Sequence, residues 1–169
     1  MDLRARLSTL IAVRVIVSTL LLGSATLVQI NRPGTLLVDP FFFLIGLTYA
    51  LSVLYIATLR FVDRHPWLVD VQLGADAVLV SAFIYVTGGV TSYFSSLLLL
   101  PIIEASTVRF RRGAVQVAVL TAVLYLALVS GQYLDVFSGL PPTWQAAVVL
   151  PSLRFAQYTV AINLFGFVA

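Results

Sequence analysis

One stretch of the sequence, from Asp70 to Gly113, contains two apolar runs separated by a short uncharged break at Gly88 and Gly89. The second run ends in a cluster of basic residues, which are Arg109, Arg111 and Arg112. Apolar runs of this length, with an uncharged turn at one end and a positive cluster at the other, are typical of two helices that cross a membrane and return. We therefore predict a transmembrane hairpin here, with Gly88 and Gly89 in its turn.

The composition indicates a membrane protein along the whole chain. Hydrophobic residues make up 60% of the 169 residues, charged residues only 10%, and the mean hydropathy is +1.04. Soluble domains contain about 25% charged residues. The formal charge of +3 comes from arginines scattered between the apolar runs, where they set membrane topology rather than form a nucleic-acid interface. The absence of cysteine excludes disulfides, thiolate metal sites and cysteine nucleophiles in this chain.

Six apolar segments joined by short polar ones predict an all-α, polytopic membrane protein built as a six-helix bundle. The predicted spans are about 8–30, 41–61, 68–87, 92–108, 114–134 and 154–169. The short gap between the third and fourth spans makes them antiparallel neighbours. Pro101 is expected to kink the fourth.

Arginine counts predict the orientation of the bundle. If six spans alternate, Arg32 and Arg154 fall on one side of the membrane and the remaining loop arginines on the other. The latter are Arg4, Arg6, Arg60, Arg64, Arg109, Arg111 and Arg112. Positive residues concentrate on the cytoplasmic side, so we predict a cytoplasmic amino terminus.

The sixth span is short when it is counted from Phe155. It would cover roughly 22 Å, less than the ~30 Å hydrocarbon core. We therefore expect this helix to be truncated, with further protein following Ala169 in the cytoplasm. A helix that begins near Ala146 would instead be long enough to complete the span.

Three ionisable residues lie deeper inside the predicted spans than the charged residues near the span ends: Arg14, Asp76 and Glu104. They lie roughly 9, 13 and 8 Å from the cytoplasmic boundary, at about 1.5 Å per residue. Such residues face the bundle interior and pair with one another, so Arg14 is expected to pair with Asp76 or Glu104. The cluster is then either a structural ion pair or a signal-transmitting, proton-linked switch, and both interpretations stay open.

Two sets of small residues at four-residue spacing are candidate helix-packing faces. One is formed by Gly46 and Ala50. The other comprises Ala114, Ala118 and Ala122.

No motif for catalysis or metal binding is found in the sequence. His65 lies in a short loop beside Pro66, which favours a solvated interfacial side chain over a phosphoaccepting histidine. Gly88 and Gly89 lack the third glycine of a phosphate-binding loop. We therefore predict no catalytic, cofactor-binding or metal-binding residues in this chain.

Several sequence features together resemble the membrane domain of PilS-like sensor histidine kinases. They are Gln72, Asp76, the segment 87–92 (TGGVTS), Phe94, the leucine run that ends at Pro101, and the segment 111–114 (RRGA). In that family a glycine-containing turn leads into a leucine-rich helix and then a glycine-headed one, within a six-helix amino-terminal domain. The resemblance covers about Val71 to Leu134 in detail, and the rest of the chain by helix count.

The resemblance implies a single transmembrane input domain over residues 1–169. PAS, histidine phosphotransfer and ATP-binding domains would follow, and histidine kinase activity with ATP and Mg²⁺ would belong to them. It also implies a bacterial cytoplasmic (inner) membrane location and a homodimer in the lipid bilayer. A response regulator would be reached through the following domains, and a membrane protein such as a pilin would be the signal.

Two other classes of function are alternatives to a sensor. A small six-helix transport or substrate-binding subunit fits the helix count, and Asp76, Glu104 and Tyr85 could line its pocket. A membrane-embedded enzyme would need a catalytic set that the sequence lacks. The reading frame beyond Ala169 separates a sensor from a transporter, because a kinase core favours a sensor and an immediate stop codon favours a transporter.

Overall fold

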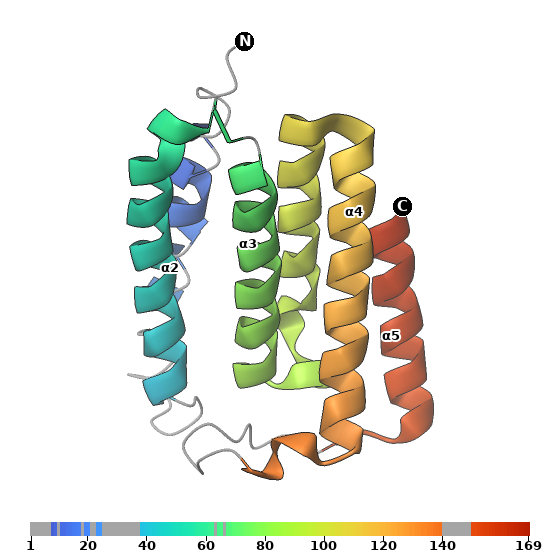
Figure 1. Cartoon of the computed structure of the whole chain (residues 1–169). Coiled ribbons are helices and arrows are strands. Elements are labelled where there is room, and N and C mark those ends of the chain that lie inside the picture. The colour runs from blue at the N-terminus through green and yellow to red at the C-terminus, as the bar shows by residue number, and fades with distance from the viewer. Residues whose placement is uncertain are drawn as a thin grey trace. The chain divides into compact units, whose positions relative to one another are not determined.

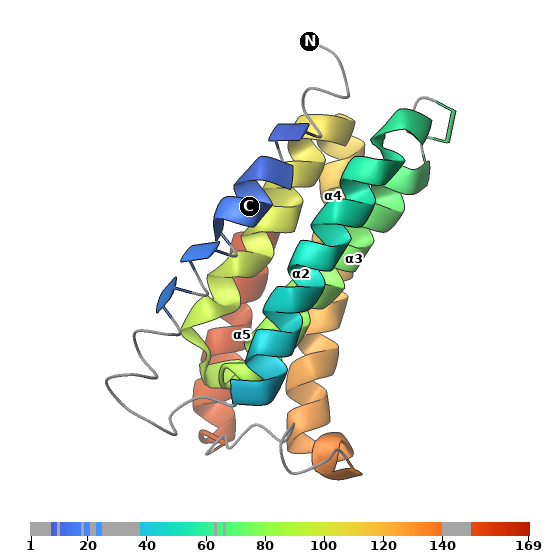
Figure 2. The same ribbon diagram turned by 90° about the vertical axis from the view of Figure 1, so that its left-hand side faces the viewer.

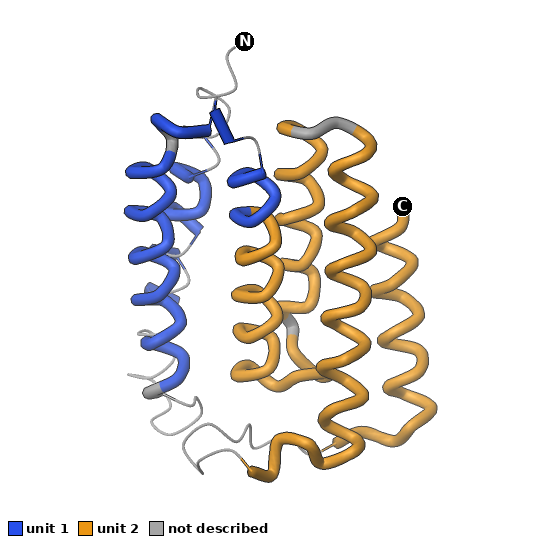
Figure 3. Tube along the Cα trace, in the orientation of Figure 1, with its two compact units in different colours: residues 1–72 blue, residues 73–169 orange. Residues whose placement is uncertain are grey.

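The computed structural model describes residues 8–9, 11–17, 19–20, 23–24, 38–62, 64–65, 67–139 and 150–169. These residues form helices and turns and no strand, which confirms the all-α prediction. The structure divides into two compact units, Met1–Gln72 and Leu73–Ala169 (Figure 3). Part of the first predicted span and residues 31–37 and 140–149 lie outside the described residues.

The first unit contains the described helical residues between 8 and 24, the helix α2 (Val38–Thr58), the 3₁₀ turn η1 (Leu59–Phe61) and the start of α3 (Trp67–Val86). Pro40 lies in the first turn of α2. The backbone N–H groups of a first turn have no carbonyl partner within the helix, so a proline there costs no hydrogen bond. Inside this unit the hydroxyls of Thr19 and Tyr49 are 2.7 Å apart. The Gln72 amide donates to Thr58 Oγ1 at 3.1 Å, so polar contacts as well as apolar packing join its helices.

The second unit contains the rest of α3, two short 3₁₀ helices, η2 (Gly89–Thr91) and η3 (Tyr93–Leu98), and the helices α4 (Leu99–Tyr133) and α5 (Leu153–Val168). A further short 3₁₀ helix, η4 (Val136–Gly139), follows α4. Figures 1 and 2 both show α3, the two arms of α4 and α5 running side by side in this unit. The core of the unit is a cluster of buried residues: Ile84, Val90, Leu98, Tyr125, Leu128, Val129, Ala156 and Phe167.

The helix α4 differs from the two separate spans expected at 92–108 and 114–134. Its backbone is helical without interruption from Leu99 to Tyr133, yet Figure 1 shows it doubling back near its middle. A straight helix would separate Leu98 from Tyr125 by about 40 Å, whereas both belong to the buried cluster. The expected loop at 109–113 is therefore a bend within helical backbone, and the antiparallel arrangement of its arms is retained.

Pro101 lies at the start of α4 rather than in the interior of a longer helix. The preceding residues, Tyr93–Leu98, form a 3₁₀ helix instead of the α-helix expected from residue 92. The hydroxyl of Ser92 accepts a hydrogen bond from Phe94 N at 3.2 Å, and Ser95 Oγ donates to Ser92 O at 2.7 Å. These bonds tighten the backbone, so Pro101 occupies a first turn, where proline is tolerated.

Three helices among the described residues are long and apolar enough to cross a membrane: Pro40–Thr58, Trp67–Val86 and Arg111–Tyr133. The first arm of α4 is a shorter apolar helix, Phe94–Val108. The helix α5 begins at Leu153, one residue before its predicted start, and has 16 residues.

Candidate functional site

A buried tyrosine, Tyr125, links three elements of the second unit. Its side chain is 0% exposed. Asn163 Nδ2 on α5 donates a hydrogen bond to the Tyr125 hydroxyl at 2.9 Å, and the side chain of Ser95 on η3 is hydrogen-bonded to the same hydroxyl. The ring of Phe167 packs edge-on against the Tyr125 ring, with centroids 5.8 Å apart. Tyr125 therefore joins the second arm of α4 to both η3 and α5.

The turn between α3 and η3 is tied to α4 by a second polar contact. The backbone N–H of Val90, which is 1% exposed, donates to Gln132 Oε1 at 3.1 Å. Gly89 has a φ of 59°, and a Cβ atom at this position would overlap the Gln132 amide. Only glycine combines this backbone conformation with so close a neighbour.

Hydrogen bonds between hydroxyl side chains and the backbone, and between two hydroxyls, stabilise the same turn. The hydroxyls of Thr87 and Ser92 are 2.7 Å apart, and Thr91 Oγ1 donates to Gly88 O at 2.9 Å. Gly88 itself has a φ of 126°. The turn is thus a compact hydrogen-bonded structure rather than an open loop.

The end of α4 is also bonded to the chain that leads into α5. The hydroxyl of Tyr133 donates to Pro151 O at 2.8 Å. Nearby, the rings of Tyr85 and Phe137 are 4.7 Å apart and tilted by 48°. These contacts lie at the end of the unit where α3 ends and α5 begins (Figure 1).

The arrangement joins several elements but offers no evident chemistry. The Val90–Gln132 contact ties the turn to α4, and the Tyr125–Asn163 contact ties α4 to α5. Among the described residues, no group of three histidine, cysteine or acidic side chains could hold a metal ion. We therefore regard the polar contacts around Tyr125 and Gln132, here called the Tyr125 relay, as the candidate functional site.

The three predicted intramembrane charges are divided between the two units. Arg14 belongs to the first unit, where its guanidinium carbon lies 4.7 Å from the centre of the Tyr55 ring. Asp76 and Glu104 belong to the second unit and are 6% and 3% exposed. Their burial is established, whereas the pairing of Arg14 with either carboxylate stays a prediction.

The predicted packing faces differ in their surroundings. Gly46 and Ala50 are exposed on α2, and a Cβ at Gly46 would meet nothing within 4 Å. Ala114, Ala118 and Ala122 are half-buried on α4, and Ala122 packs against the buried cluster. A close approach that the sequence did not suggest is at Gly74 of α3, where a Cβ would lie 3.8 Å from Leu120 Cδ2.

The sequence prediction missed the relay residues, which are Ser95, Tyr125, Gln132 and Asn163. It concentrated on ionisable groups. A usable signal was the presence of amide side chains in these apolar segments, which are Gln116, Gln132, Gln157 and Asn163, because amides within membrane helices bond across helix interfaces. The sequence does not show which of the four do so.

Comparison with known proteins gives one match. No curated protein and no solved structure matches the chain. A family model described as the PilS-like transmembrane domain matches residues 1–166, which is nearly the whole chain and includes the helices of both units. The protein is therefore a multi-pass membrane protein that belongs to the PilS-like transmembrane domain family.

Proposed function

We propose that this chain is the signal-input domain of a two-component sensor histidine kinase in a bacterial inner membrane. The family match supports a sensor membrane domain. In this proposal, PAS, phosphotransfer and ATP-binding domains follow residue 169, hold ATP and Mg²⁺, and act in a homodimer on a response regulator. A membrane protein such as a pilin is the proposed class of stimulus.

One observation carries the proposed mechanism: α5, the helix nearest to those domains in the sequence, is bonded through Asn163 to the buried Tyr125. A stimulus acts by binding two conformations of the domain with different affinities. The two conformations differ in the position of α5 relative to α4, and the Asn163–Tyr125 bond stabilises one of them. Breaking that bond should therefore change kinase output without any stimulus.

The first test is the substitution Asn163→Leu in the full-length protein in lipid nanodiscs. One hydrogen bond between membrane helices contributes about 1 kcal/mol, so basal autophosphorylation should change about fivefold. Tyr125→Phe, which also removes the contact to Ser95, should change it in the same direction. The double variant should change it little beyond Tyr125→Phe alone, because both substitutions remove the Asn163–Tyr125 bond.

Thr159→Val is the matched control for this test. Thr159 lies one turn before Asn163 on α5, and its hydroxyl donates to Phe155 O of its own helix at 3.0 Å. Its loss breaks no contact between helices, so output should stay at the wild-type level. Wild-type output from correctly folded Asn163→Leu would contradict the transmission route, and the absence of any histidine autophosphorylation would contradict the sensor kinase assignment itself.

A second prediction concerns the two buried carboxylates. Asp76→Asn and Glu104→Gln should each alter kinase output or lower the unfolding free energy by about 1–3 kcal/mol, because the interactions of a buried charge are strong. Asp70→Asn is the control, since Asp70 is exposed on the same helix as Asp76. Autophosphorylation and thermal unfolding measure both effects. Unchanged values for the two buried variants would show that this cluster has no role in signalling or in stability.

A further inference from the structure

The helix α5 carries a shallow, open concavity on a face that the relay does not use. The concavity has a volume of about 500 Å³ and is lined by Arg154, Gln157, Tyr158 and Ala161. Positions three, four and seven residues apart share one face of a helix. All four side chains are exposed in the chain, and Tyr158 is 73% exposed.

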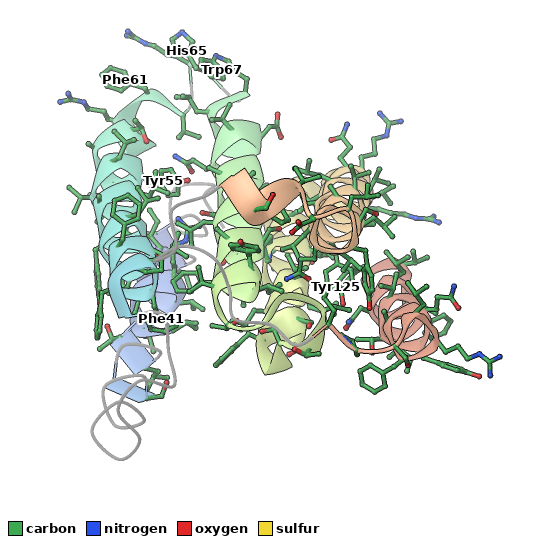
Figure 4. All side chains as sticks on the ribbon, turned by 90° about the horizontal axis from the view of Figure 1, so that it is seen from below. Phe41, Tyr55, Phe61, His65, Trp67 and Tyr125 are labelled. Atoms are coloured by element: carbon green, nitrogen blue, oxygen red, sulfur yellow. The ribbon has the colours of Figure 1, made fainter. Side chains whose placement is uncertain are left out.

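The opposite face of α5 is the one that packs in the second unit. Ala156 and Phe167 are 4% and 3% exposed within the buried cluster, and Asn163 bonds to Tyr125. Figure 4 labels Tyr125 and shows further side chains of α5 on the side away from it. The concavity and the relay therefore lie on opposite faces of α5.

The outward surface of α5 changes in character along its length. Its first two turns expose Arg154, Gln157 and Tyr158 together with Leu153 and Phe155, and the exposed residues after them are all apolar. Ile162, Phe165 and Val168 are 70%, 77% and 83% exposed. From Tyr158 to Phe165 the helix rises about 10 Å, so a cationic, hydrogen-bonding end continues directly into an apolar surface.

We propose that this concavity binds the anionic headgroup of a phospholipid, with an acyl chain along the apolar surface that follows. The guanidinium of Arg154 is the group best suited to a phosphate, because its planar fork donates two parallel hydrogen bonds. The Gln157 amide and the Tyr158 hydroxyl supply further donors. The exposed Ile162 and Phe165 favour a lipid over a free phosphate ion, which has no apolar part to bury.

The position of Arg154 in the predicted topology supports a specific role. It is one of only two loop arginines predicted on the extracytoplasmic side, so the cytoplasmic preference of arginine does not account for it. Tyr158, one helical turn after Arg154, has an amphipathic ring of the kind that is enriched at the membrane–water interface. The predicted ligand is therefore an anionic lipid of the extracytoplasmic leaflet.

The test is lipid retention by the full-length protein, measured by native mass spectrometry after release from nanodiscs that contain equal amounts of phosphatidylglycerol and phosphatidylcholine. Wild-type protein should retain phosphatidylglycerol preferentially. Arg154→Gln should retain about fivefold less, since one basic side chain near the membrane surface contributes about that factor. Arg154→Lys keeps the charge but loses the planar guanidinium. Its retention of phosphatidylglycerol should therefore lie between that of the wild-type protein and that of Arg154→Gln.

Arg60→Gln is the matched control, because Arg60 is an exposed arginine of the other unit, and its loss should lower phosphatidylglycerol retention less than the loss of Arg154 does. Unchanged retention by Arg154→Gln, or an equal loss in Arg60→Gln, would overturn the proposal. Displacement of the lipid by inorganic phosphate would show a phosphate site instead. Altered subunit number in Arg154→Gln with unchanged lipid retention would show a protein interface. The readout does not involve kinase output, so this proposal can fail or succeed independently of the proposed function.

Discussion

Tyr125→Ala is expected to lower the free energy of unfolding by about 3 to 5 kcal/mol, the range found when a buried aromatic side chain is removed from a packed core. Tyr125 is completely buried, packs on Phe167 and accepts a hydrogen bond from Asn163. Its removal leaves a cavity in the cluster and an amide without its acceptor. Unfolding in mixed micelles with increasing SDS would measure the change.

Two further variants separate the parts of this effect. Tyr125→Phe keeps the ring and removes the hydroxyl, so it should cost only about 1–2 kcal/mol. Phe155→Ala also removes an aromatic ring from the second unit, but Phe155 is 54% exposed on α5, and a loss below about 1 kcal/mol is expected. A loss in Tyr125→Ala as small as that in Phe155→Ala would show that Tyr125 does not hold α4 and α5 together.

Gly89→Ala should produce the second large effect, a loss of about 2 to 5 kcal/mol. The left-handed backbone at Gly89 costs roughly 1–2 kcal/mol for any other residue. The new methyl group also overlaps the Gln132 amide. That flexible side chain can swing aside, but the buried Val90 N–H then loses its acceptor, at a cost of about 1–3 kcal/mol. Unfolding in mixed micelles with increasing SDS would measure this loss.

A double-mutant cycle tests the cause. Once Gly89→Ala has displaced Gln132, the further substitution Gln132→Ala should cost much less than it does in the wild-type protein. Gly139→Ala is the control, because a Cβ there meets nothing within 4 Å. Strictly additive losses for Gly89→Ala and Gln132→Ala would mean that the glycine is required for its backbone conformation alone.

The positions of the helices could be predicted from the sequence because membrane spans are set by apolar length. The prediction for α3 was about 68–87 and the structure has Trp67–Val86. The prediction for α5 began at 154 and the helix begins at Leu153. The 3₁₀ helix at Tyr93–Leu98 was not predicted, since it depends on local serine hydrogen bonds. The helical bend of α4 was not predicted either, because its arginines and glycine suggest a loop.

The candidate site was harder to predict than the fold. Charged residues in apolar segments are conspicuous, and Asp76 and Glu104 are indeed buried. The relay instead depends on pairs that are far apart in the sequence, such as Tyr125 with Asn163 and Val90 with Gln132. Apolar periodicity does not show which face of one helix meets which face of another, so these pairs required the three-dimensional structure.

Most of the buried hydroxyl groups on these helices donate hydrogen bonds to a carbonyl four residues earlier in the same helix. Examples are Thr48, Ser52, Ser81 and Thr121. Such a group stays satisfied when its helix slides or rotates against a neighbour, so sliding leaves no unpaired donor behind. These hydroxyl bonds therefore do not oppose a change of helix register, which under the proposed function would let a weakly binding stimulus choose between two arrangements of α4 and α5.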